Sequence, residues 1–144
     1  MHPREIVKAL NRNLEKEYAS ALFYIQTMNL VDTLKERRLK NIISRLAEDE
    51  MRHAERLADR IAEMGGKSSW HLAPFERKNT LRESIEQIIA DEDDAIREYT
   101  ELMSKTEEEP KLWITLKEIV DEEKGHRARA EALLKANVTL FGTT

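Results

Sequence analysis

Apolar residues recur at steps of three and four along almost the whole chain, and this period constrains the fold more than any other feature of the sequence. Apolar side chains at that spacing lie on one face of an α-helix. Four segments carry such a stripe, at about residues 4–31, 34–64, 80–105 and 108–136. The sequence therefore predicts an all-α protein, a four-helix bundle that forms a single domain over 1–144.

The ends of these segments predict two antiparallel helix pairs joined by one long crossover. Thr33 to Glu36 and Thr80 to Glu83 have the capping-box pattern that begins a helix, and Gly65-Gly66 is typical of a helix end. Thr106 to Pro110 is expected to open the fourth helix, and Trp70 and Trp113 to pack the crossover and the start of that helix. Residues 65–79 could span roughly 50 Å if extended, so this connection permits the second and third helices to be parallel without requiring it.

Composition excludes several classes of function. The chain has no cysteine, which excludes disulfides, thiolate metal sites and cysteine nucleophiles. No apolar run is long enough to cross a bilayer and the first residues lack the apolar core of a secretory signal, so we expect a cytoplasmic protein without a membrane partner. The formal net charge of −4 and the absence of a lysine-rich tail argue against nucleic-acid binding.

Each apolar stripe is interrupted near its middle by a polar group. The interrupting residues are Glu17, Glu50 with His53, Glu92, and Glu123 with His126. All six fall on the three-four spacing of their own helix, so their side chains should point into the core. Counted from the predicted turns, the four glutamates also lie at similar depths. We therefore expect them to share one layer of the bundle.

Four buried carboxylates need compensating cations, because burying unpaired charge is costly. Two divalent ions would neutralise four carboxylates. Glu50 with His53, and Glu123 with His126, are three residues apart on one helix face, so each pair can address one ion. A carboxylate-rich site with a few imidazoles suits iron or manganese better than structural zinc. This ligand set is that of the di-iron carboxylate bundles.

The motifs around these residues resemble those of a known family. The run from Glu50 to Arg56 resembles the second-helix metal motif of bacterioferritins, Glu17 followed by Tyr24 resembles the first-helix motif, and Asp121 to His126 resembles the fourth-helix motif. The resemblance covers about residues 4–136 and implies a ferritin-like fold. It also implies that Glu17 and His53 are terminal ligands of one iron and Glu92 and His126 of the other, with Glu50 and Glu123 bridging the two ions.

The resemblance implies a ferroxidase that oxidises Fe(II) with oxygen or peroxide and stores iron in a homo-oligomeric shell. Two alternatives remain open: a rubrerythrin-like peroxide-reducing or other di-iron oxidoreductase without storage, and a non-catalytic helical interaction protein. The absence of cysteine weighs against a rubrerythrin, as does Ala95 where rubrerythrins carry an extra carboxylate.

Three further residues bear on the chemistry. Tyr24 and Tyr99 each follow a predicted terminal ligand by seven residues. We expect Tyr24 to act on the site, by a hydrogen bond or by one-electron donation, and Tyr99 to be a core aromatic. Met51 matches the haem-ligating methionine of bacterioferritins but points about 100° away from Glu50. Its ordinary interpretation is an exposed or interface methionine, with haem binding as the alternative.

Overall fold

A computed structural model of the chain describes residues 1–31 and 36–136 as four helices and their connections. The helices are α1 (Pro3–Met28), α2 (Arg37–Glu63), α3 (Leu81–Ser104) and α4 (Pro110–Ala136), and they form the predicted four-helix bundle. No strand occurs in these residues. Within the described chain, none of the helices is both long and apolar enough to cross a membrane.

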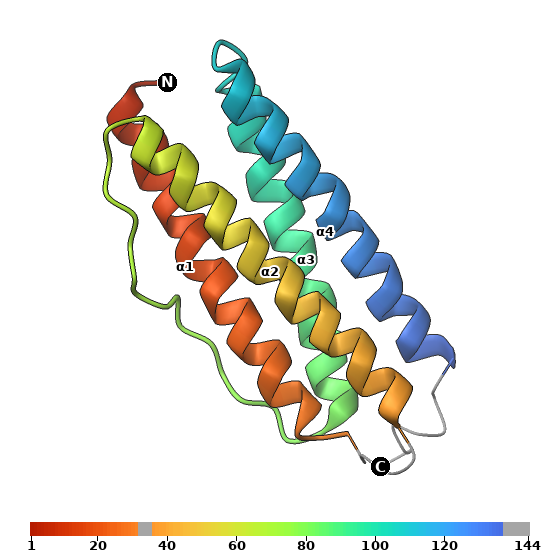
Figure 1. The fold of residues 1–144 in the computed structure, drawn as a ribbon. Coiled ribbons are helices and arrows are strands. Elements are labelled where there is room, and N and C mark those ends of the chain that lie inside the picture. Colours follow the sequence, from red (N-terminus) through yellow and green to blue (C-terminus); the bar gives the residue numbers. More distant parts are fainter. Residues whose placement is uncertain (32–35, 137–144) are drawn as a thin grey trace.

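The long connection between α2 and α3 sets the directions of the helices. It runs along the bundle beside α1, from the end where α2 finishes to the opposite end where α3 begins (Figure 1). As a result α2 and α3 are parallel, whereas α1 with α2 and α3 with α4 form antiparallel pairs (Figure 1). This arrangement is the crossover that the sequence permitted but could not require.

Three hydrogen bonds fix the backbone of the crossover on α1. The Asn11 amide donates to the carbonyl of Lys67 at 3.0 Å and its oxygen accepts from the Ser69 N–H at 2.8 Å. Farther along, the Ala73 N–H donates to the carbonyl of Glu15 at 3.1 Å. The crossover is therefore a fixed cover over one side of α1.

Two aromatic residues of the crossover differ in how they pack against the bundle. Phe75 packs edge-on against Phe23 of α1, with ring centroids 6.2 Å apart. Trp70, in contrast, is 86% exposed, so the prediction that it packs the crossover is wrong. The Asn11 contacts hold the backbone there without help from the indole ring. Trp113 is partly buried near the start of α4.

The helix ends follow the local sequence in most places. Gly65 adopts a φ of +78°, and the N–H groups of Gly65 and Gly66 return to α2 carbonyls at 3.0 and 2.9 Å, a pattern that satisfies the end of the helix. The Thr80 side chain accepts from the Glu83 N–H at 3.1 Å and caps α3. The predicted capping box at Thr33 to Glu36 lies partly outside the described residues.

The start of α4 differs from the prediction. The helix begins at Pro110, not in the acidic run before it. Thr106, expected to lie in the segment that opens this helix, instead donates its hydroxyl to the carbonyl of Leu102 at 2.9 Å and so belongs to the end of α3. Proline fits the first helical position because its missing N–H would have had no partner there.

The core consists of two apolar clusters separated along the bundle axis. One lies at the N-terminal end of α1 and includes Leu10, Leu14, Leu57, Ile61, Leu116 and Ile119. The other lies at the opposite end and includes Phe23, Ile43, Leu46, Ile85, Ile88 and Ala130. Along each helix, the predicted metal ligands fall between residues of one cluster and residues of the other. The fold therefore places a polar layer between two apolar ones.

Candidate metal centre

The polar layer contains all six side chains that interrupt the apolar stripes. Each of them is at most 4% exposed: Glu17, Glu50, His53, Glu92, Glu123 and His126. One glutamate comes from each helix, and the two histidines come from α2 and α4, where each lies one helical turn after a glutamate. The sequence pattern and the structure thus bring the same six residues together.

These residues form two overlapping groups whose ligand atoms converge. One group is Glu17, Glu50, His53 and Glu123, and the other is Glu50, Glu92, Glu123 and His126. In each group the candidate ligand atoms all lie within 4.8 Å of one another. Glu50 and Glu123 belong to both groups, so the geometry offers two adjacent cation positions that share two carboxylates.

The histidine ring nitrogens show how close the groups are. Nδ1 of His53 lies 3.3 Å from Glu123 and 3.6 Å from both Glu17 and Glu50. Nδ1 of His126 lies 3.0 Å from Glu50, 3.2 Å from Glu123 and 3.6 Å from Glu92. The two rings are stacked, with centroids 5.8 Å apart. Both Nδ1 atoms therefore face the shared carboxylates.

Many of the converging atoms have no hydrogen-bond partner although they are buried. They are Glu17 Oε2, Glu50 Oε1, Glu92 Oε2, both carboxylate oxygens of Glu123, and Nδ1 of His53 and of His126. Buried polar atoms are normally paired, because an unpaired one costs about 1–3 kcal/mol. Seven such atoms directed at one small volume are the expected surroundings of bound cations. The donor set, four carboxylates and two imidazoles, also fits a pair of iron or manganese ions.

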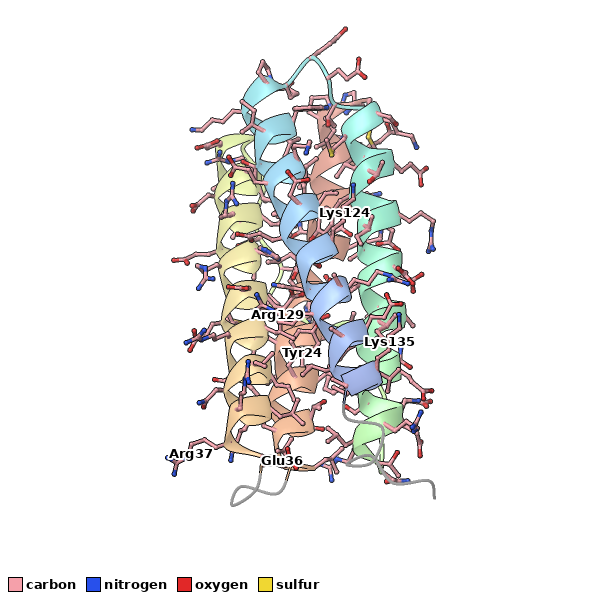
Figure 2. The ribbon with its side chains drawn as sticks, turned by 90° about the vertical axis from the view of Figure 1, so that its right-hand side faces the viewer. Tyr24, Glu36, Arg37, Lys124, Arg129 and Lys135 are labelled. Atoms are coloured by element: carbon pink, nitrogen blue, oxygen red, sulfur yellow. The ribbon has the colours of Figure 1, made fainter. Side chains whose placement is uncertain are left out.

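Two buried tyrosines hold the terminal carboxylates. Tyr24, in the interior of the bundle (Figure 2), donates its hydroxyl to Glu92. Tyr99 donates to Glu17 at 2.6 Å. Each tyrosine thus orients a carboxylate on the other helix pair. The sequence assigned this kind of hydrogen bond to Tyr24 and treated Tyr99 as a core aromatic, yet the two phenols occupy equivalent positions.

Two acidic residues that were not predicted from the sequence contact Nε2 of the histidines, on the side away from the shared carboxylates. Nε2 of His53 pairs with Glu122, and Nε2 of His126 lies 2.8 Å from Asp49. A carboxylate accepts the Nε2 proton, which leaves Nδ1 free to bind a cation. Each of these acids immediately precedes a shared glutamate, but a residue in that position lies about 100° around the helix and resembles a surface acid, so the sequence carried no signal that identified them.

The shared carboxylates raise the proton affinity of both rings. Burial alone would lower the pKa of His53, but the Glu123 and Glu17 carboxylates beside it outweigh burial and raise its pKa to about 11. For His126, burial is likewise outweighed by Glu123 and Glu92, and its pKa rises to about 9. Without metal, both rings are therefore imidazolium ions at neutral pH.

The carboxylates themselves separate into protonated and ionised groups. Burial, with the charges of Glu17 and Glu123, raises the pKa of Glu50 well above its usual value. Burial also raises the pKa of Glu92 to about 8, against the opposing effect of His126. For Glu123, burial is outweighed by the imidazole rings of His126 and His53, whose Nδ1 atoms lie 3.2 and 3.3 Å away, so its pKa lies below the usual range. Protons occupy the metal-free centre in place of cations.

Met51 does not belong to the centre. Its side chain is 50% exposed on α2, one residue beyond Glu50. This placement agrees with the helical geometry, which turns it away from the polar layer.

Comparison with known proteins bears on the fold and the family. The family model of the ferritin-like domain matches residues 7–137. No curated protein sequence matches the chain. Two solved structures illustrate the similarity of fold. The bacterioferritin of Desulfovibrio desulfuricans, whose di-iron site was observed in different catalytic states, has a TM-score of 0.89 at 23% identity, covering 98% of this chain and 84% of that one.

The second structure is the dodecameric thioferritin of Bacteroides fragilis, described as a bacterioferritin-related protein. It has a TM-score of 0.88 at 20% identity and covers 97% of this chain and 90% of that one. At these identities the structures support the four-helix architecture. The family model, which spans nearly the whole chain, supports membership, and the chain belongs to the ferritin-like family.

Proposed function

We propose that the protein is a ferroxidase that binds two Fe(II) ions as substrate and oxidises them with oxygen or peroxide. The observation that carries this proposal is the pair of overlapping ligand groups, which share two carboxylates and direct seven unpaired buried atoms at one volume. A structural metal site usually holds one ion with four closed ligands, whereas these groups offer two adjacent positions rich in carboxylate oxygens.

The proposed roles follow from which group each residue belongs to. Glu17 and His53 belong to one group only, as do Glu92 and His126 to the other, so these four are terminal ligands. Glu50 and Glu123 belong to both and bridge the two ions. Tyr24, Tyr99, Asp49 and Glu122 hold the ligands in place by hydrogen bonds.

The reaction needs little covalent chemistry from the chain. Two Fe(II) ions lose one electron each, and one oxygen molecule with two protons becomes hydrogen peroxide, or one peroxide with two protons becomes two waters. The residues hold the substrate ions side by side, and the two apolar clusters close the centre at both ends along the bundle axis.

We further propose that copies of the chain assemble into a hollow shell that stores the ferric product. The support for this part is the dodecameric assembly of the Bacteroides fragilis protein, which has the same fold. A dimer or tetramer in solution would favour the alternative of a di-iron oxidoreductase that does not store iron. Size-exclusion chromatography with light scattering distinguishes the two.

Anaerobic Fe(II) titration followed by oxygen tests the ferroxidase. We expect the ferric absorbance to saturate at about two irons per chain in the first turnover, as the ligand count requires. Glu17→Gln should weaken one position, whereas Glu48→Gln, at an exposed position of α2, should titrate as the unmodified protein does. Continued slow oxidation with no break near two irons, equal in all three proteins, would contradict the proposal. Repeating the titration with anaerobic hydrogen peroxide identifies the oxidant.

A further inference from the structure

A cavity of about 420 Å³ connects the metal centre to the surface on one side of the bundle. It lies between α1 and α3, and crossover residues 73–76 and 78 form its outer wall. Its inner end is formed by four of the six centre residues: Glu17, Glu50, Glu92 and Glu123. The two histidines do not line it, so a ligand in this cavity meets the carboxylates first.

The inner end of the cavity presents oxygen atoms that lack partners. Glu17 and Glu92 are 3% and 1% exposed, and Oε2 of each has no hydrogen-bond partner. The opposite side of the centre differs, because Asp49 and Glu122 cover the histidines there. A cation arriving from the α1 and α3 side thus meets free ligand atoms.

The outer part of the cavity also carries an excess of negative charge. Its polar lining there includes the acids Asp91, Asp94 and Glu76, against two lysines, Lys16 and Lys78. Lys16 forms an ion pair with Glu98 at 2.5 Å, and Asp94 forms one with Arg97 at 2.9 Å. In the part of the chain that the structure describes, the unpaired charges of the outer lining are then Asp91 and Glu76 against Lys78. A pocket lined mainly by one sign of charge concentrates counter-ions and raises their rate of association.

Asp91 is the acid best placed to receive a cation. It precedes Glu92 on α3 and is partly buried in the cavity lining. The amide of Gln87 donates to Oδ1 of Asp91 at 2.8 Å, which fixes the carboxylate while leaving Oδ2 available. Asp94 and Glu76, which share the lining, are exposed.

We propose that this cavity is the port through which hydrated divalent cations reach the metal centre, and that Asp91 is the first residue to bind them. The inference rests on the proposed function, since it assumes that the six centre residues bind metal. An ion with six waters occupies roughly 200 Å³, from about 30 Å³ per water. The cavity therefore has the volume to hold an ion with its hydration shell, and we place the exchange of waters for carboxylate oxygens at its inner end.

Stopped-flow uptake of Co(II) tests the port without requiring oxidation, because protein-bound Co(II) absorbs visible light. Asp91→Asn should slow uptake roughly tenfold at low ionic strength, with a smaller effect at high salt. The final stoichiometry should stay at about two ions per chain by the ligand count. The matched control is Asp59→Asn, which removes the same charge from an exposed site on α2 outside the cavity and should load normally.

A second variant narrows the cavity without changing its charge. Ser20 lines it from α1 and is partly buried, so Ser20→Phe should slow uptake at every salt concentration. Uptake at the unmodified rate in both Asp91→Asn and Ser20→Phe, with both chains folded by circular dichroism, overturns the port alone. No Co(II) uptake in the unmodified chain overturns port and centre together. Variant-dependent uptake with no oxidation of Fe(II) supports the port and overturns only the ferroxidase.

Discussion

The first helix pair, α1 with α2, and the second, α3 with α4, supply the same groups to the centre at the same spacings but hold them in different protonation states. The first pair contributes Glu17, Tyr24, Asp49, Glu50 and His53. The second contributes Glu92, Tyr99, Glu122, Glu123 and His126. Each tyrosine donates a hydrogen bond to a glutamate of the opposite pair, and each outer acid accepts one from a histidine of the opposite pair.

The two shared glutamates show the difference most clearly. Burial and the charges of neighbouring carboxylates raise the pKa of Glu50, so it holds a proton in the metal-free protein. For Glu123, the two imidazolium rings beside it outweigh burial and lower the pKa. Equivalent positions in the sequence thus become one neutral acid and one anion, because so crowded a layer cannot ionise all its carboxylates at once.

Replacing these two glutamates by glutamine should have the largest effects of any change. Either Glu50→Gln or Glu123→Gln removes a ligand from both cation positions, so we expect Fe(II) oxidation at about two irons per chain to be lost in both variants. The check is the same anaerobic titration, with Glu48→Gln as the exposed control. Retention of the two-iron endpoint in either variant would show that the glutamate is not shared.

The same two variants should differ in the stability of the metal-free protein. Glutamine resembles the protonated form of Glu50, so Glu50→Gln should leave the free energy of unfolding unchanged or raise it. Glu123→Gln leaves two buried imidazolium rings without their common anion and should lower that free energy by about 3 kcal/mol. Chemical denaturation in the presence of a chelator measures both. Equal destabilisation of the two variants would mean that Glu50 and Glu123 have the same protonation state in the metal-free protein.

Raising the pH should lower the stability of the metal-free protein, because buried groups of the centre lose the protons that they hold in place of cations. The pKa of His126 is about 9 and that of Glu92 about 8, both above the unfolded values, so the native state binds more protons than the unfolded state between about pH 6.5 and 8. Stability of the metal-free protein should therefore fall as the pH rises through this range and on to pH 9. Calorimetry with a chelator present checks the direction, and a melting temperature that rises over the range would contradict it.

Metal binding should reverse this pH dependence. At pH 7 His53, Glu92 and His126 hold protons, and the raised pKa of Glu50 favours its protonated form. All must lose their protons to act as ligands, so Co(II) loading should release up to about four protons per pair of ions. The stabilisation that metal gives should accordingly grow with pH. A pH indicator in weak buffer counts the protons directly.

The sequence predicted which six polar side chains meet in the core, because burial and spacing are both local properties of a helix. Glu17 and Glu92 could be identified as interruptions of an apolar stripe. Asp49 and Glu122 could not, because a residue next to a buried position lies about 100° around the helix and looks like an ordinary surface acid. The role of Asp49 and Glu122 depends on which helix of the other pair faces them. The sequence does not determine that neighbour, just as it does not determine the path of the crossover. Protonation states likewise require distances between helices.

Removing the outer acids should have the next largest effect and should distinguish the two histidines. Asp49→Asn takes away the carboxylate that holds Nε2 of His126, and we expect metal affinity to fall about tenfold. Glu122→Gln should cost less, because the side chain of Glu122 is 47% exposed whereas that of Asp49 is 21% exposed. Competition with a Co(II)-binding indicator measures both, with Asp121→Asn on the exposed side of α4 as the control. An equal loss in the two variants would argue that exposure does not weaken the outer acid.

The tyrosines should give the smallest effects and the sharpest comparison of the halves. Tyr24→Phe and Tyr99→Phe each remove one hydrogen bond to a terminal carboxylate and leave the ring in the core, so we expect each to lower metal affinity about threefold. If the phenols only position Glu92 and Glu17, both variants should also oxidise bound Fe(II) at similar rates. If Tyr24 also donates an electron, Tyr24→Phe alone should slow single-turnover oxidation after both variants are saturated with Fe(II), and a tyrosyl radical should be detectable by electron paramagnetic resonance only when Tyr24 is present. A slow step confined to Tyr99→Phe would reverse the assignment, because it would place the electron donor beside the cavity that Tyr99 lines.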